Sequence, residues 1–277
     1  MTTTADTATD SAYTPPVRRV NHGRGHSYQD AVGRRVPGVT TIIGEGIPKP
    51  ALINWSANTT AAYAVDHWDE LADMTPSVRL KTLQGARFSD RDTAANRGTR
   101  VHALGERLAK GEEVEVPEEL AGHVESYVRF LDEWDVWPVL QEFVTVSHRH
   151  GYAGTADLIA NLRHPHNPGE RELWLLDIKT SRSGVFGDVA LQLAGYRYAD
   201  CYVGADGLER PIPAVTRTGV VHVRADGYDL VPVTAGLQQH RALLYAQQVS
   251  RFCAGARDLV GEALTPPRHI EREEVKA

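Results

Sequence analysis

The chain has 277 residues, of which 42% are hydrophobic and 24% charged, and its formal net charge is −6. This balance is typical of a folded globular protein and excludes a general polyanion binder coated in lysine. No apolar stretch reaches the about 20 residues of a bilayer-spanning helix, and the N-terminus does not resemble a secretory signal. Two cysteines, Cys201 and Cys253, are too few for a disulfide framework, so we expect a cytoplasmic protein of a bacterial or phage-infected cell.

The N-terminal third of the chain is expected to precede the main domain. Residues 1–17 are small, polar and proline-containing, which predicts a disordered tail. Residues 18–87 are interpreted as a helical extension. Within it, Val39–Ile43 reads as a short β-like run, and a helix is expected from Ala51 to Val65.

The main domain is expected over residues 88–260, followed by a charged tail at 261–277. Its apolar spacing changes from the helical period to the strand period and back, which predicts an α/β fold with a central mixed sheet flanked by helices. The expected helices are 90–110, with Ser89 as N-cap, then 118–134, 187–203 and 235–253. The expected strands are 139–147, 153–162, 172–179, 219–224 and 228–233.

Two acids face each other in the expected hairpin of strands 153–162 and 172–179. A turn centred on Asn167 pairs Asp157 directly with Asp177, and like charges so placed destabilise a sheet unless a proton or a cation neutralises them. Lys179 lies two residues after Asp177 and therefore on the same strand face. Two acids beside a lysine can hold Mg²⁺ or Mn²⁺ and hydrolyse a phosphodiester. A solvated strand end with a surface salt bridge is the alternative.

Four short motifs in order resemble the PD-(D/E)XK nucleases, and within them the RecB-type exonucleases that include phage and CRISPR-adaptation enzymes. They are GTRVH at 98–102, GTAD at 154–157, DIK at 177–179 and QLAGY at 192–196. The resemblance covers roughly residues 90–203 and implies a restriction-endonuclease-like core. The first motif has Ala156 where the superfamily has proline, and the second acid is aspartate where glutamate is commoner.

The resemblance also implies roles for individual residues. Asp157, Asp177, His102 and the backbone carbonyl of Ile178 would ligate the metal, and Glu142 would serve a second metal. Lys179 would be the catalytic lysine. The catalytic set also includes two helix residues, Gln192 and Tyr196, which share a face at i and i+4. The cysteines of cluster-bearing relatives are absent, so no iron–sulfur cluster is expected.

Other polar and aromatic residues permit two interpretations each. Arg97, Arg100 and Arg182 either contact DNA phosphates or line a solvated face. Trp55 and Tyr63 either stack bases or pack in the core, and the core is favoured. The histidines at 148, 150, 164 and 166 lie in expected turns without a cysteine partner, so solvated turn residues are favoured over zinc ligands.

The sequence therefore favours a Mg²⁺- or Mn²⁺-dependent deoxyribonuclease that acts as an exonuclease on DNA ends or single strands, in recombination, repair or phage replication. A structure-specific endonuclease of the same fold and a non-catalytic DNA-binding recombination partner are the alternatives. A recombination or replication protein is the kind of partner expected. Polarity, strand preference and oligomeric state are not readable from the sequence.

Overall fold

The structure is a computed structural model that describes residues 17–23, 25–109, 114–167, 169–181 and 184–265. Within helix α4 (Pro76–Ala109), the side chains of 89–97, 99, 102, 106, 108 and 109 are also outside the described set. Nearly all of the expected N-terminal tail and residues 266–277 of the C-terminal tail therefore lie outside the described residues.

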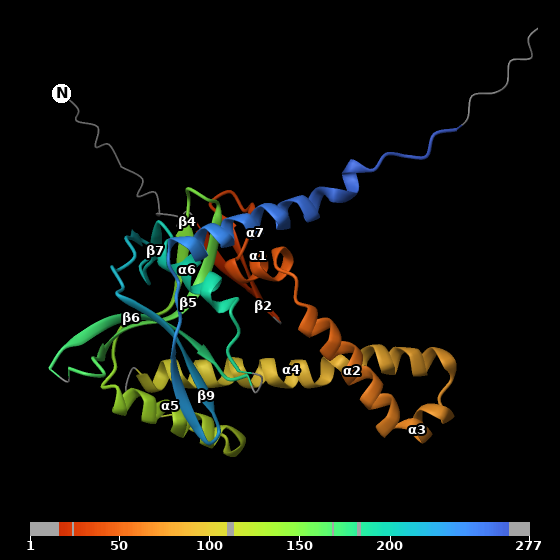
Figure 1. Cartoon of the computed structure of the whole chain (residues 1–277), viewed down its shortest axis with the longest axis horizontal. Helices are drawn as coiled ribbons and strands as arrows, with labels where there is room; N and C mark the ends of the chain where they lie inside the picture. The colour runs from red at the N-terminus through yellow and green to blue at the C-terminus, as the bar shows by residue number, and fades with distance from the viewer. Residues whose placement is uncertain (1–16, 24, 110–113, 168, 182–183, 266–277) are drawn as a thin grey trace, which may run out of the picture.

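A mixed seven-stranded sheet forms the centre of the molecule (Figure 1). Its strand order is β10-β9-β6-β5-β4-β7-β8, in which β6 and β9 are parallel and all other neighbours antiparallel. The strands are β4 (Trp137–Ser147), β5 (Tyr152–Arg163), β6 (Arg171–Lys179), β7 (Cys201–Val203), β8 (Glu209–Arg210), β9 (Arg217–Arg224) and β10 (Gly227–Pro232). The expected α/β class with a mixed central sheet is confirmed.

Helices cover both faces of this sheet because successive strand residues are apolar on both sides. One face packs against α1 (Val39–Gly46), α6 (Val189–Arg197) and α7 (Leu237–Gly255), and Ile159 and Leu175 lie on this face. The other face packs against α5 (Ala121–Glu133), which follows a 3₁₀ turn at Glu118–Leu120. A second 3₁₀ turn, Ala256–Leu259, follows α7.

Three expected elements differ from the structure. The β-like run at Val39–Ile43 is the first part of helix α1, whose residues Val39, Ile42 and Ile43 bury one stripe against α7. The helix expected to begin after Ser89 begins at Pro76 and so crosses the domain boundary expected at residue 87. The helix expected over 187–203 ends at Arg197, because 201–203 form strand β7 beside β4.

The segment expected to be a helical extension also contains a small antiparallel sheet of β1 (Val17–His22), β2 (Gly25–Asp30) and β3 (Arg35–Val36). After α1, helices α2 (Pro50–Asp66) and α3 (Trp68–Asp73) and the first part of α4 extend away from the central sheet. We call these helices the arm.

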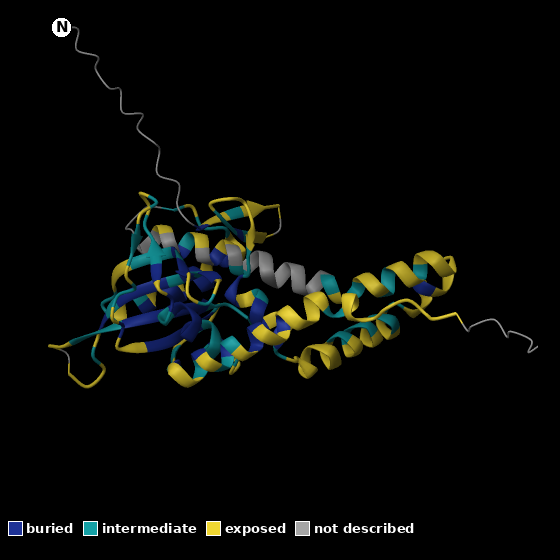
Figure 2. Ribbon diagram, turned by 90° about the horizontal axis from the view of Figure 1, so that it is seen from above, coloured by how far each residue is buried: buried dark blue, intermediate teal, exposed yellow. Residues whose placement is uncertain are grey.

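The arm is largely exposed, as the yellow helices of Figure 2 show. Helix α2 has no buried residue and packs against α4 and α3. The core packing favoured for Trp55 and Tyr63 is therefore wrong: Trp55 is exposed, and Tyr63 packs only partly buried against His67. Among the described helices, none combines the length and apolar character needed to cross a bilayer.

Candidate active site

Asp157 and Asp177 lie on adjacent strands, as the expected hairpin register requires. The ladder between β5 and β6 runs from the pair Arg163–Arg171 to the pair Leu158–Leu176. One residue beyond that last pair, the same register sets Asp157 opposite Asp177. The ladder ends there, and Asp157 instead accepts a hydrogen bond through Oδ2 from the amide of Ile178 at 2.7 Å. This bond fixes the Asp157 carboxylate beside the strand that carries Asp177.

Asp177 is a buried acid, with 2% of its surface exposed. Its Oδ1 accepts hydrogen bonds from Gln192 Nε2 at 2.7 Å and from Lys179 Nζ at 3.2 Å. Its Oδ2 is also buried and lies 2.9 Å from Lys179 Nζ, but it accepts no well-aligned hydrogen bond from the described residues. One carboxylate oxygen in the cluster thus keeps acceptor capacity.

Lys179 pairs with Asp177 on the same face of β6. Burial acts to lower the pKa of the Lys179 ammonium, but the adjacent Asp177, followed by Asp157 and Asp188, outweighs burial and raises it. The solvated strand end considered from the sequence is therefore wrong for Asp177, because its carboxylate is held by two side chains inside the protein.

Helix α6 brings its motif residues to the acids. Gln192 donates both to Asp177 and, at 3.2 Å, to the hydroxyl oxygen of Tyr196 one turn further on. Burial raises the pKa of the Tyr196 hydroxyl well above its ordinary value, and nearby Tyr28, Asp177 and Asp157 add to this. Tyr196 can pack so close to β5 because residue 154 is glycine: a Cβ there would lie 2.4 Å from Tyr196 Cε1.

Glu142 extends the acidic row to a third strand. Its neighbours Gln141 and Phe143 pair with Leu158 and Ala156, so Glu142 lies at the level of Asp157. Its φ of 45° lies in the left-handed region, which a residue other than glycine occupies at a cost of about 1 kcal/mol or more. The Glu142 carboxylate lies 3.6 Å from Arg19 on β1. The row of acids therefore crosses β4, β5 and β6.

Helix α4 passes the end of β6, where the motif with His102 was expected to approach the acids. A Cβ at Gly98 would lie 3.2 Å from the hydroxyl of Thr180, the residue after Lys179. The side chains of His102 and Arg97, and the whole of Arg182, lie outside the described residues, so their expected roles stay predictions. Arg100 is exposed and pairs with Glu119 at 2.9 Å.

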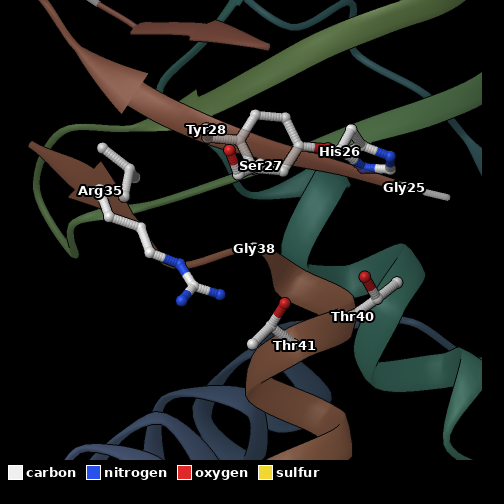
Figure 3. A pocket seen from close by; sticks show the side chains of 9 residues that line it. Gly25, His26, Ser27, Tyr28, Arg35, Gly38, Thr40 and Thr41 are labelled. Carbon is white, nitrogen blue, oxygen red and sulfur yellow. Dashed lines mark hydrogen bonds between the residues drawn. The ribbon is translucent and has the colours of Figure 1, made fainter. Parts of the chain in front are cut away.

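A polar cavity of about 240 Å³ lies on the small sheet and the start of α1, and none of the acids lines it. The sequence motifs did not reveal this cavity. It is bounded by β2, β3 and the start of α1 (Figure 3), and its lining residues are Gly25, His26, Ser27, Tyr28, Arg35, Val36, Gly38, Thr40 and Thr41. Figure 3 shows the Arg35 side chain extending toward Thr41. The Tyr28 hydroxyl is 2.8 Å from that of Thr155, so a residue that lines the cavity also contacts the strand that carries Asp157 two residues further on.

No protein-family model matches the chain, and no curated protein sequence matches it. The functional interpretation therefore depends on the geometry of the site and on the motif resemblance.

Proposed function

We propose that the chain is a metal-dependent deoxyribonuclease, and specifically an exonuclease that hydrolyses phosphodiester bonds at DNA ends. The observation that carries the proposal is the convergence of Asp157, Asp177 and Lys179 at one place, where Gln192 from a separate helix holds Asp177. An ordinary surface ion pair would not require a buried acid or a second element to position it.

The residues present fit a divalent cation. The buried Oδ2 of Asp177 has unused acceptor capacity among the described residues, and carboxylate oxygens are the ligands that Mg²⁺ and Mn²⁺ prefer. Asp157 and Asp177 would hold the ion, with the Ile178 carbonyl and His102 as further proposed ligands and Glu142 for a second ion. When bound, the cation would polarise the phosphoryl group and make a bound water more acidic.

The protein's own side chains would orient the reaction. Lys179 supplies a positive charge beside the acids, which would stabilise the charge that develops on the phosphoryl oxygens. Gln192 holds the carboxylate of Asp177 in one orientation, so that the site is preorganised before DNA arrives.

The cavity that Tyr28 links to β5 supports action at DNA ends. Arg35 has no ion-pair partner among the described residues, and the hydroxyls of Thr40 and Thr41 are further donors around the same space. Guanidinium and hydroxyl groups are the donors that bind phosphate. We propose that this cavity receives a terminal phosphate while the adjacent linkage lies at the acids.

The test is cleavage of end-labelled linear DNA and of a closed circle, each with Mn²⁺. Digestion of the linear DNA alone supports an exonuclease, whereas cutting of the circle supports the endonuclease alternative. Asp177→Asn removes the charge at nearly constant shape and should reduce cleavage by about 10²-fold or more, since a site group that stabilises the reaction is lost. Asp229→Asn, an exposed acid on β10, is the matched control. Full cleavage by a folded Asp177→Asn variant would refute the mechanism.

A further inference from the structure

Three metal-ligating side chains meet at the far edge of the central sheet, away from the acid row. His148 follows β4, Cys201 begins β7 and Glu209 begins β8. The sheet brings them together, because Cys201 pairs with Val146 of β4 and Glu209 pairs with Val203 of β7. We call these three residues the edge cluster.

One ring nitrogen of His148 faces both partners. Its Nε2 lies 2.7 Å from Glu209 Oε1 and 3.8 Å from Cys201 Sγ, and the three ligand atoms lie within 4.8 Å of one another. No cysteine partner was expected for His148 from the sequence, but the structure places Cys201 beside it. His164, in contrast, accepts a hydrogen bond at Nδ1 from the amide of His166, and its Nε2 lies 3.9 Å from Oε1 of Glu172.

Two ligand separations in the edge cluster can be compared with those of a tetrahedral site. Zinc–sulfur and zinc–nitrogen bonds of about 2.3 and 2.0 Å place sulfur and nitrogen ligands about 3.5 Å apart, and nitrogen and oxygen ligands about 3.3 Å apart. The sulfur–nitrogen separation nearly fits, and the nitrogen–oxygen pair needs to open by about 0.6 Å. The side chains of His148 and Glu209 are 45% and 26% exposed, so they have room to do so, while Cys201 is a buried anchor.

The chemistry of the cluster selects one class of ion. A thiolate with an imidazole and a carboxylate suits zinc, whereas Mg²⁺, Ca²⁺ and Mn²⁺ prefer oxygen ligands alone.

We propose that His148, Cys201 and Glu209 bind one Zn²⁺ ion, with water in the fourth position. Binding would release the thiol proton of Cys201 to solvent and join three segments that the sheet holds weakly, since β7 has three residues and β8 has two. His148 follows Ser147, which pairs with Tyr152 at the start of β5. Asp157 lies five residues further along β5, which at about 3.3 Å per residue is roughly 17 Å from the edge cluster. The zinc site is thus separate from the proposed nuclease site.

Cobalt titration of the full chain, stripped of metal with a chelator, tests the proposal. Co²⁺ bound to a thiolate gives a charge-transfer band in the near ultraviolet, which should saturate at one equivalent per chain and disappear when Zn²⁺ is added. Cys201→Ser should abolish the band, and His148→Asn should weaken affinity more than about a hundredfold. Cys253→Ser replaces the exposed cysteine and is the matched control.

Zinc should also raise the thermal midpoint of the wild-type chain and of Cys253→Ser, but not that of Cys201→Ser. Because His148 is exposed, His148→Asn gives a folded variant even if Cys201→Ser folds poorly. A wild-type chain without the band, or a band that survives in Cys201→Ser, would overturn the proposal. Asp177→Asn should keep the band, so a failed zinc site and a failed nuclease site give different results.

Discussion

Replacing Gly154 by alanine should lower the free energy of unfolding, because the added methyl group would clash with the Tyr196 ring. The added Cβ would lie 2.4 Å from Tyr196 Cε1 and 3.2 Å from Val39 Cγ2. Ordinary carbon contacts begin near 3.5 Å, so the Tyr196 ring would have to retreat by about 1 Å. The ring is buried and its hydroxyl is bonded to Gln192, so this movement is resisted.

The expected cost follows from opposing contributions. Overpacking a core costs about 1–3 kcal/mol. Replacing glycine restricts the unfolded chain and returns about 0.4–1 kcal/mol. The net expectation is a loss of about 1–2 kcal/mol in the free energy of unfolding. The cleavage rate should also fall, but less than in Asp177→Asn, because Tyr196 acts on Asp177 only through Gln192.

Urea unfolding measures this loss, with Gly44→Ala as the matched control. Gly44 lies in helix α1 and a Cβ there meets nothing within 4 Å, so that change should stabilise the chain by up to about 1 kcal/mol. In a Tyr196→Leu background the ring is gone, and Gly154→Ala should cost much less, because only the 3.2 Å contact with Val39 remains. An equal cost of Gly154→Ala in both backgrounds would refute the steric reasoning.

Two further predictions concern a histidine and an arginine. Burial, followed by neighbouring His150, lowers the pKa of His240 below 6.5, against a smaller opposite effect of Asp200. Only the unfolded chain then binds the proton just below pH 6.5, so stability should fall as pH drops through 6.5, with a slope of at most about 1.4 kcal/mol per pH unit. His240→Gln should flatten that slope in urea unfolding at several pH values, and an unchanged slope would contradict it. Arg35→Ala should raise KM for DNA with little change in kcat, most clearly at low salt. Arg34→Ala, which removes an exposed partner of Asp30, is the control and should leave KM unchanged. Equal KM values for Arg35→Ala and the wild-type chain would exclude Arg35 from DNA binding.

The hairpin of β5 and β6 could be predicted because its information is local. The single turn between the two strands fixes the register, and the register alone sets Asp157 against Asp177. The i+4 spacing of Gln192 and Tyr196 likewise predicted one helix face, and the structure turns Gln192 toward Asp177.

The errors arose where distant packing decides the local structure. Val39–Ile43 is rich in β-branched residues, which favours a strand, but α7 offers a surface for a helical stripe. The signal for that helix was the spacing of Val39, Ile42, Ile43 and Gly46, which is the 3.6-residue period.

The cavity and the edge cluster needed contacts that the sequence does not encode locally. Tyr28 meets Thr155 across 127 positions, and Cys201 meets His148 across 53. The left-handed backbone of Glu142 is also set by its surroundings, since no glycine or asparagine marks that position.

The exposed arm has a consequence for the dynamics of the chain. Helix α2 has 17 residues, none of which is fully buried, and it packs against the exposed helices of the arm and not against the core. It therefore gains little beyond the marginal stability that an isolated helix of that length has in water. Its amides should therefore open and exchange with deuterated solvent long before those of β5 and β6, whose opening requires the core to come apart. The molecule thus combines a rigid body that fixes the chemical groups with an appendage that can fray and reform while the body stays folded.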